Sequence, residues 1–327
     1  MRMLPLNVQT LYADLVQSLT FSDVQPGSPF EQTIKGKVYL YASEKHGARR
    51  IQRYLGPASD PEVCQRADAI RRAAQDARNR RVTITLLKRA GIPAPSVAMG
   101  RVLEVVANAG LFRNGVMLVG TGAYQVYGPL LGIALPALSA GTQDADLAAA
   151  SLAVGSNTDG EDLLTILRRA DATFEGQPML DPRALPGRFR SSAGLDVDVL
   201  TRYRSRKDER GLVPIPGLRC SAQPLRYLEY LTQESIEAIA LYGSGTRVTV
   251  PSPARYAVHK LIVAQARDER SRKRPKDLVQ AQSLIEALQA NEPDNLEEAV
   301  ADARARGPKW VQMIDRSLNE LGLQGRI

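Results

Sequence analysis

The stretch 142-TQDADLAAASLAV-154 decides the fold, because it combines the alternation of a β-strand with two carboxylates on one face. Successive side chains of a strand point to opposite faces, so Asp144 and Asp146 lie together while Ala145 and Leu147 point the other way. Two like charges this close repel each other unless a cation joins them. Carboxylate oxygens are ligands that Mg²⁺ prefers, so the stretch predicts a metal-binding strand.

A second stretch, 195-LDVDVL-200, repeats this layout. Its apolar residues face one way, and Asp196 and Asp198 face the other. If the two strands are neighbours, three or four carboxylates converge. Such a cluster suits two metal ions about 3.5–4 Å apart, which align an attacking oxygen with a leaving pyrophosphate. The alternative is that each acidic pair lies on an exposed sheet face, or serves calcium binding or turn chemistry.

A strand that turns into a helix precedes both acidic strands. The segment 116-VMLVG-120 is rich in β-branched residues, and Gly120, Thr121 and Gly122 lead into a short helix. Such a turn presents free backbone N–H groups and the positive end of a helix dipole to a phosphate. The turn alone is weak evidence, but its place before two acidic strands favours a nucleotide site.

Together, these motifs resemble those of the nucleotidyltransferases of the DNA polymerase β superfamily. In that group a hydrophobic-Gly-Gly/Ser turn is followed by an Asp-x-Asp strand and by a third carboxylate on an adjacent strand. The matching residues are Gly120, Thr121, Asp144, Asp146 and Asp198. The resemblance implies that the three aspartates are catalytic and hold two Mg²⁺ ions, for which Mn²⁺ can substitute. It also implies that Gly120 and Thr121 contact the phosphates of an NTP such as ATP.

The C-terminal stretches 253-PARYAVHKLIVAQAR-267 and 273-KRPKDLVQAQSLI-285 are similar to the helical region of the toxin–antitoxin nucleotidyltransferases of the abortive-infection class. There, a Lys, an Arg and a Lys/Arg-Asp pair complete the nucleotide site. The matching residues are Lys260, Arg267, Lys276 and Asp277. Basic groups in such positions neutralise triphosphate charge, and the likeness also implies a possible antitoxin partner. The plainer alternatives are a surface lysine at position 260 and first-turn helix chemistry at Asp277.

The sequence departs from the family pattern at three places. The interval from Gly120 to Asp144 is long, which implies an insertion around residues 128–141. Thr121 replaces the commoner Ser or Gly, and Gln280 stands where the toxin-type motif has a further Asp. The third carboxylate is assigned to Asp198 rather than to its neighbour because two apolar residues and a Thr follow it.

The remaining chain predicts an α/β (α+β) protein with a mixed-sheet nucleotidyltransferase core. Residues 1–110 are expected to form an N-terminal β-hairpin and helices, 111–250 the catalytic core, and 251–327 a C-terminal helical bundle. The hairpin is expected within 37–57, and a helix that starts at Asp60-Pro61 runs to about residue 90. This helix is rich in arginine, which indicates either a solvated face or a groove for RNA.

Composition limits the classes of function. The 327 residues are 44% hydrophobic and 24% charged, with no run of about 18 apolar residues, so a cytoplasmic protein without membrane contact is expected. Two distant cysteines and two histidines argue against a disulfide framework, a zinc site or histidine-based catalysis. The net charge of +8 favours a polyanionic partner without proving one.

The leading hypothesis is therefore a Mg²⁺-dependent nucleotidyltransferase that moves a nucleoside monophosphate from an NTP to an acceptor and releases pyrophosphate. RNA, in particular a tRNA 3′ end, is the favoured acceptor, while a protein hydroxyl or a small molecule is an alternative. A non-catalytic nucleotide- or RNA-binding module on the same fold is the second hypothesis, and a partner-binding scaffold is the third.

Overall fold

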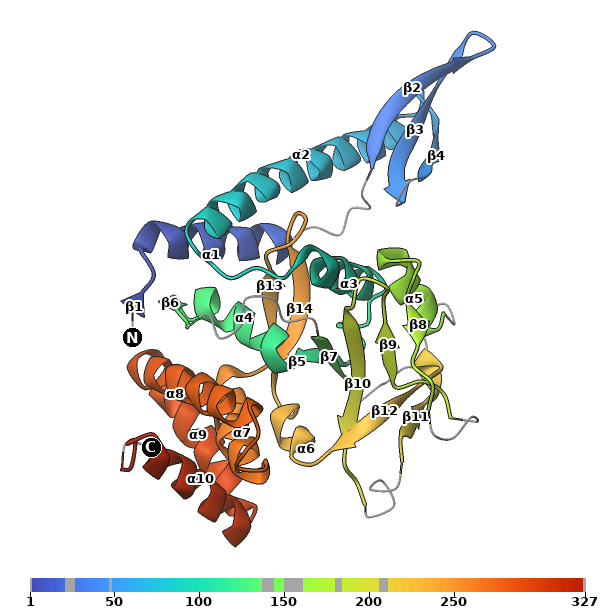
Figure 1. Cartoon of the computed structure of the whole chain (residues 1–327). Coiled ribbons are helices and arrows are strands. Elements are labelled where there is room, and N and C mark those ends of the chain that lie inside the picture. Colours follow the sequence, from blue (N-terminus) through green and yellow to red (C-terminus); the bar gives the residue numbers. More distant parts are fainter. Residues whose placement is uncertain are drawn as a thin grey trace. The chain divides into compact units, whose positions relative to one another are not determined.

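The computed structural model describes residues 2–20, 27–46, 49–136, 144–149, 161–179, 184–205 and 211–325. Parts of the expected acidic strand at 142–154, of the Gly/Pro-rich passage and of the charged loop at 202–211 lie outside the described residues. Contacts between residues divide the chain into two compact units. The first comprises residues 1–9, 92–242 and 246–327, and the second comprises residues 10–91 with 243–245 (Figure 1).

The second unit is built from an antiparallel sheet and a long helix. Its sheet has the order β2-β3-β4, and its elements are α1 (Leu6–Thr20, which starts in the first unit), β2 (Ser28–Ile34), β3 (Lys37–His46), β4 (Arg49–Pro57) and α2 (Pro61–Arg89). The Asp60 side chain caps α2 by accepting a hydrogen bond from the Glu62 N–H at 2.9 Å, and Pro61 begins the helix. The expected hairpin and helix are confirmed, and β2 adds a third strand.

A mixed sheet forms the centre of the first unit, with the strand order β11-β12-β10-β7-β5 (Figure 1). β7, β10 and β12 run parallel, whereas β5 and β11 pair antiparallel at the two ends. β9 lies antiparallel along the first residues of β10, and β8 pairs with β9. These strands are β5 (Val116–Val119), β7 (Asp144–Ala149), β8 (Glu175–Gly176), β9 (Arg188–Arg190), β10 (Asp196–Arg202), β11 (Val213–Ile215) and β12 (Cys220–Leu225). The expected mixed α/β fold class is confirmed.

Short elements and helices complete this unit. Two small antiparallel pairs join β1 (Arg2–Met3) to β6 (Ile133–Ala134) and β13 (Ser235–Ala240) to β14 (Thr246–Pro251). The helices before the C-terminal region are α3 (Val97–Asn108), α4 (Gly120–Leu130), α5 (Leu163–Ala170), the 3₁₀ turn η2 (Pro216–Leu218) and α6 (Leu228–Leu231). The C-terminal helices are α7 (Pro253–Ala266), α8 (Lys273–Asn291), α9 (Pro293–Ala305) and α10 (Pro308–Glu320). The helical structure expected after residue 251 is thus confirmed.

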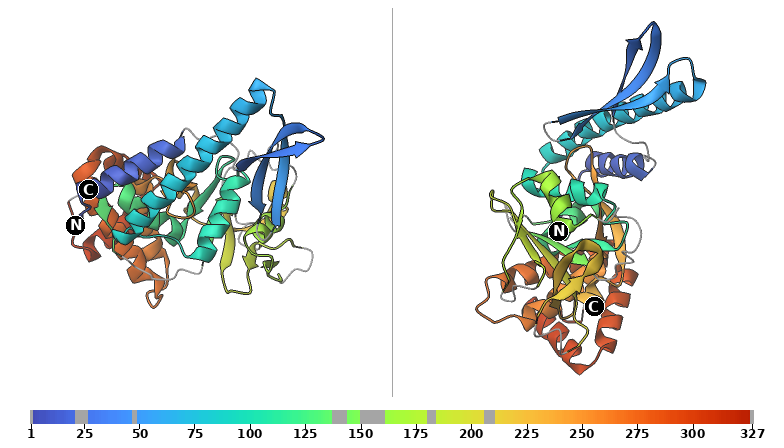
Figure 2. Two further views of the ribbon diagram at one scale, coloured as in Figure 1. Left: turned by 90° about the horizontal axis from the view of Figure 1, so that it is seen from above. Right: turned by 90° about the vertical axis from the view of Figure 1, so that its right-hand side faces the viewer.

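One continuous apolar core joins the sheet to the C-terminal helices. Buried side chains run from Leu118 and Val197 in the sheet to Tyr256 in α7 and Leu284 in α8, and all four are 0% exposed. The central strands and the C-terminal helices are therefore held by shared packing. Figure 2 shows these helices against the strands from two further directions. The expected division into three domains is not tested by this packing and stays a prediction.

Short elements occupy two stretches of the first unit. Only β8 is a strand within residues 172–176, and β11, β12, β13 and β14 lie between residues 213 and 251. The break between β11 and β12 comes from η2, where Pro216 starts a tight turn and Arg219 adopts a left-handed φ of 47°. None of the described helices is both long enough and apolar enough to cross a membrane.

Candidate active site

The two acidic strands are direct neighbours in the central sheet. β7 and β10 pair in parallel, and their register places Asp144 beside Asp196 and Asp146 beside Asp198. Adjacent strands lie about 4.8 Å apart, so these four carboxyl groups project from the same small area of one sheet face. The convergence expected from the sequence is therefore present. The alternating residues Ala145, Val197 and their neighbours are buried on the opposite face.

The short strand β9 places an arginine beside each aspartate of β10. Arg188 is the partner of Asp198 and holds both carboxylate oxygens, through its Nε at 2.5 Å and its Nη2 at 2.9 Å. Arg190 is the partner of Asp196 and lies 3.1 Å from it. Each row across the sheet thus reads carboxylate, carboxylate, guanidinium. Both arginine side chains are more than half exposed, so water screens these ion pairs.

Gly120 makes room for the central carboxylate. β5 ends at Val119, the register partner of Asp146, and the chain turns at Gly120 with a φ of +62°. A Cβ atom on Gly120 would lie 2.1 Å from Oδ2 of Asp146. Only glycine fits here, both because of the left-handed backbone and because of the close approach of the carboxylate. This contact explains physically why a glycine precedes an acidic strand in this motif.

Asp146 is the most strongly perturbed of the four carboxyl groups. Burial, followed by the charges of Asp198 and Asp144, raises its pKa from 3.8 to about 6, while Lys260 and Lys273 act in the opposite direction. The pKa shift corresponds to a cost on the order of 3 kcal/mol for keeping the ionised form buried. The site therefore concentrates negative charge that its own cations leave incompletely balanced.

The start of α4 meets the start of α8 at the predicted phosphate-binding turn. Lys276 donates a hydrogen bond from Nζ to Oγ1 of Thr121 at 2.9 Å, although the two residues are 155 positions apart. Burial and the nearby Lys260 lower the pKa of Lys276. The preceding residue Val119 provides no side-chain cap for α4, so the first amides of the helix are available to an anion.

Asp277 gathers the two remaining predicted basic residues. Its carboxylate contacts Lys260 Nζ at 2.6 Å through one oxygen and Arg267 Nε at 2.6 Å through the other. Burial raises the pKa of Asp277, but the two cations outweigh that effect and the net shift is downward. Lys260 is only 9% exposed, so the surface-lysine alternative is wrong. Asp277 is 3% exposed and doubly paired, which is more than first-turn helix chemistry.

A hydrogen-bonded chain connects α7 and α8 to the Gly120 turn. The Tyr256 hydroxyl donates to the carbonyl oxygen of Gly120 at 2.8 Å and lies 3.2 Å from the side-chain amide of Gln280. Gln280 is fully buried. Since a hydroxyl has one proton, the chain is complete when the Gln280 amide nitrogen donates to Tyr256. Gln280 therefore braces the phosphate-binding turn, at the position where the resemblance would place an aspartate.

The donor set fits a divalent cation chemically, although the side chains are not arranged as a closed cage. Within the described ranges, no group of three or more Asp, Glu, His or Cys side chains forms such a cage. The reason is visible at Asp198, whose carboxylate is turned toward Arg188. The raised pKa of Asp146 indicates that a further positive charge at this point would stabilise its ionised carboxyl group. A cation here would compete with Arg188 for Asp198.

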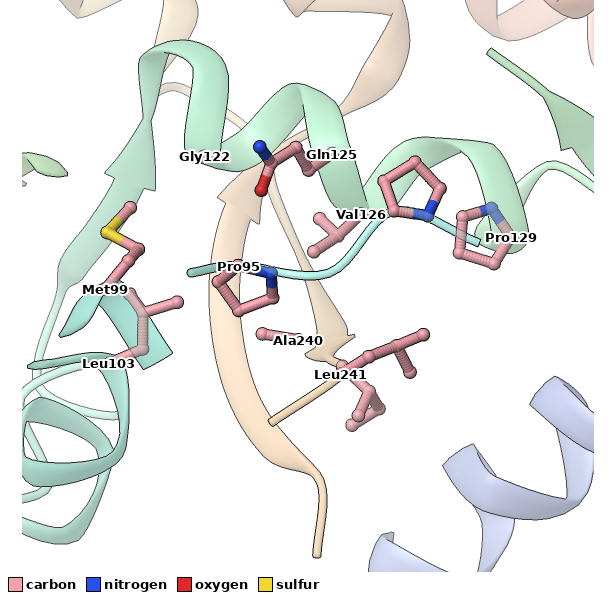
Figure 3. A pocket seen from close by; sticks show the side chains of 11 residues that line it. Pro95, Met99, Leu103, Gly122, Gln125, Val126, Pro129, Ala240 and Leu241 are labelled. Carbon is pink, nitrogen blue, oxygen red and sulfur yellow. The ribbon is translucent and has the colours of Figure 1, made fainter. Parts of the chain in front are cut away.

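Two cavities lie apart from the carboxylates. A small apolar pocket between α3, α4 and β13 is lined by Met99, Val126 and Leu241 among others, and its volume of about 10 Å³ holds one water at most (Figure 3). A larger cavity of about 300 Å³ is lined by Tyr203, Trp310 and neighbouring residues beyond the end of β10. No aspartate of the site lines either of these two cavities.

Four participants were absent from the sequence-based prediction: Arg188, Arg190, Lys273 and Tyr256. The arginines had a detectable signal, because 188-RFR-190 alternates charge in the same way as 196-DVD-198. Tyr256 and Lys273 had none, since a single tyrosine or lysine on a helix is compatible with many roles. The predicted residues themselves fall into one site, linked by the Gly120 turn and by the influence of Lys260 on Asp146.

Comparison with known proteins agrees with this geometry. A family described as "Nucleotidyltransferase" matches residues 97–305, which is more than half of the chain and includes every residue of the site. The chain belongs to this nucleotidyltransferase family. No curated protein matches it. A crystal structure of an antigenic nucleotidyltransferase-like protein from Paracoccidioides brasiliensis is similar at 18% identity, over 68% of this chain and 94% of that one, with a TM-score of 0.32.

The match to the nucleotidyltransferase family has a clear boundary. It begins at the first residue of α3 and leaves out residues 10–91, the main part of the second unit. The central sheet and helices α7, α8 and α9 are thus inside the matched residues, whereas α10, the sheet β2–β4 and helix α2 are outside them. The relation to the DNA polymerase β superfamily and to toxin–antitoxin proteins stays a prediction.

Proposed function

We propose that this nucleotidyltransferase is Mg²⁺-dependent and moves a nucleoside monophosphate from an NTP to an acceptor hydroxyl, with release of pyrophosphate. The observation that carries the proposal is the register of β7 and β10, which sets Asp144, Asp146 and Asp198 on one face beside the Gly120 turn. A binding module would not need this crowding of like charges, because the crowding destabilises the fold without a catalytic return.

The three aspartates are the proposed ligands of the metal. When bound, two Mg²⁺ ions, or Mn²⁺ in their place, would supply Lewis-acid stabilisation of the attacking oxygen and of the leaving pyrophosphate. Asp146 occupies the middle of the site, between Asp144 on its own strand and Asp198 on the next. Its position makes it the residue whose removal should be least tolerated.

The proposed triphosphate site lies where the Gly120 turn faces the basic side chains of α7 and α8. Thr121 and the first amides of α4 would bind phosphate oxygens, and Lys276 already lies on the Thr121 hydroxyl. Lys260 and Arg267, oriented by Asp277, are the proposed groups that offset the charge moving to pyrophosphate. Arg267 has the planar geometry for two hydrogen bonds to one phosphate, and its side chain is 31% exposed and hence accessible.

The proposed transfer step is an in-line displacement. The oxygen of the acceptor hydroxyl forms a bond to the α-phosphorus of the NTP while the bond from that phosphorus to the bridging oxygen breaks, and pyrophosphate leaves. The hydroxyl proton passes to Asp198, the proposed base, once the ion pair with Arg188 has opened. RNA, in particular a tRNA 3′ end, is the favoured acceptor on the basis of the charge of +8, and a protein hydroxyl is the alternative. An antitoxin partner and a cytoplasmic location stay predictions.

Label transfer from four α-labelled NTPs tests the proposal. Each NTP is offered with Mg²⁺ or Mn²⁺ and with total tRNA, cell-extract protein or no acceptor, and pyrophosphate release is measured in parallel. Asp144→Ala and Asp146→Ala should abolish transfer, whereas Asp315→Ala, which removes an exposed surface ion pair, should leave it unchanged. Equal transfer by all three variants would refute the assignment. NTP binding without pyrophosphate release would favour the non-catalytic binding module.

A further inference from the structure

The second unit carries most of the net charge of the chain, although it has no residue in the site described above. Between residues 10 and 91 the sequence has 14 Lys and Arg against 8 Asp and Glu, a net charge of +6 out of +8 for the whole chain. Helix α2 spans about 43 Å at 1.5 Å per residue. Most of its basic side chains are exposed: Arg66, Arg71, Arg72, Arg78, Arg81, Lys88 and Arg89.

One face of the sheet β2–β4 is used to pack against α2. Leu40 and Ala42 of β3 are 3% and 0% exposed, and Leu40 joins Val63 and Ala67 of α2 in a small apolar cluster. Gly56 of β4 approaches α2 so closely that a Cβ atom would lie 2.5 Å from Val63. Because side chains alternate along a strand, the residues between these positions face away from α2.

The opposite face carries a ladder of four aromatic rings. Phe30 of β2 stacks on Tyr41 of β3, with ring centroids 5.7 Å apart and planes 24° apart. Tyr54 of β4 meets Tyr41 edge-on at 5.3 Å and Tyr39 at 6.0 Å. The chain has only five Phe, eleven Tyr and one Trp, so about a quarter of its aromatic residues gather on this small face. Tyr54 is 53% exposed.

An antiparallel sheet with one face packed usually shows a polar second face. Aromatic rings in that position increase the exposed apolar surface: Tyr54 is exposed, and Phe30, Tyr39 and Tyr41 are half-buried. The polar residues with described side chains that share the face by register are Ser28, Gln32, Lys37, Ser43, Arg50 and Gln52. None of the residues whose side chains are described on this face is acidic. The face therefore combines flat apolar rings with hydrogen-bond donors and positive charge.

We propose that the aromatic face of the β2–β4 sheet is a binding site for single-stranded RNA. Unpaired bases would stack on the rings of Tyr54, Tyr41 and Phe30, and phosphates would contact Lys37 and Arg50 on the same face, while the exposed basic side chains of α2, on the other side of the sheet, add to the positive potential of this unit. A duplex keeps its bases stacked inside and cannot use the rings, so single-stranded segments are the preferred form. The charge complementarity to a polyanion favours RNA over a second protein as the occupant.

This surface also bears on the acceptor of the transfer reaction. Most of the unit lies outside the residues matched by the nucleotidyltransferase family, so its role is additional to that of the shared core. The additional role that fits this surface is to bind an RNA acceptor. That last step rests on the proposed transfer activity, whereas the RNA-binding surface does not, because binding needs neither the carboxylates nor an NTP.

Fluorescence anisotropy of a labelled 12-nucleotide RNA with the full-length protein tests the surface. Tyr54→Ala should weaken binding about 5- to 100-fold, as expected for loss of one base stack, and Tyr54→Phe should retain it. Ile51→Ala is the matched control, because Ile51 lies on the same strand, is 51% exposed and occupies the opposite face. Asp146→Asn should bind RNA as the wild type does, which separates this proposal from the failure of transfer.

A comparison of single-stranded with duplex RNA tests which form the aromatic face binds. The same RNA paired into a duplex should bind at least about 10-fold more weakly, and affinity for the single strand should fall as salt is raised. Equal affinity for duplex, or equal affinity of Tyr54→Ala and Ile51→Ala, would overturn the stacking site. Absence of RNA binding, with self-association that Tyr54→Ala abolishes in sedimentation, would also overturn it and would assign the face to a second copy of the chain.

Discussion

Asp146 and Asp277 are both largely buried carboxyl groups in the first unit, and their surroundings shift their pKa values in opposite directions. Asp146 lies among other aspartates and its pKa rises to about 6. Asp277 meets Lys260 and Arg267 at 2.6 Å each, and its pKa falls. One group holds charge that the protein leaves unbalanced, and the other holds charge that is matched. The first arrangement suits the uptake of a cation, and the second suits the orientation of side chains.

Replacing Asp146 should give the largest effect of the comparison. Asp146→Asn should reduce NMP transfer to the blank rate, because the central ligand is lost. The same change should stabilise the fold by about 1–3 kcal/mol, since it removes the cost of burying a charge and, after that, the repulsion from Asp198 and Asp144. Transfer assays and thermal unfolding of the variant measure both effects, with Asp315→Asn as the surface control. A lower Tm together with normal transfer would contradict the unbalanced charge at Asp146.

Replacing Asp277 should have the opposite effect on stability. Asp277→Asn leaves Lys260 and Arg267 with their positive charges unpaired, and Lys260 is almost fully buried. Urea unfolding should show a loss of about 2–4 kcal/mol, with the partial exposure of Arg267 limiting the cost. Weaker NTP binding should accompany it, because the two cations lose their common anchor. If Asp277→Asn were as stable as the wild type, the ion pairs of Asp277 with Lys260 and Arg267 would have no structural role.

The close approach of Gly120 to Asp146 allows a finer test of the role of the Asp146 carboxylate. Gly120→Ala places a methyl group against Oδ2 of Asp146, and we expect transfer to fall about 100-fold because the carboxylate is displaced. Gly194→Ala is the matched control, since Gly194 also has a positive φ, of +83°, but a Cβ there meets nothing within 4 Å. Both variants should lose about 1 kcal/mol from backbone strain. Similar transfer rates for both would show that the close approach is unimportant.

The smallest expected effect comes from His259, which directly precedes Lys260 in α7. Burial, then the charge of Lys260, lowers the pKa of His259 from 6.5 to about 3, and its Nδ1 is buried without a hydrogen-bonding partner among the described residues. The unfolded chain therefore takes up a proton below pH 6.5 that the folded chain refuses, so stability is lost as pH falls from about 6.5 toward 3. His259→Gln should lose about 2 kcal/mol less than the wild type between pH 7 and pH 5 in urea unfolding. Parallel pH profiles would exclude this role.

Local pattern was sufficient to predict much of the fold and part of the site. Alternation predicted β7 and β10, and the Asp60-Pro61 pair predicted the start of α2, because strand alternation and helix caps depend on residues close in sequence. Arg188 on Asp198 and Lys276 on Thr121 were beyond such reasoning. Those contacts depend on which strands and helices become neighbours over distances as long as 155 residues. The three residues of β9 alternate in charge, but this alternation does not indicate which strand β9 pairs with.

The pairing of β7 with β10 has a consequence for folding fidelity. The register joins Asp196 to Asp144 and continues for five pairs to Leu200 and Ala148. A slip of one residue in either strand would turn its aspartates into the apolar core and its core residues out to solvent. Burying those charges costs several kcal/mol each, so misaligned forms cannot compete with the native pairing. The aspartates proposed for catalysis therefore also disfavour misaligned pairing of β7 with β10 when the sheet forms.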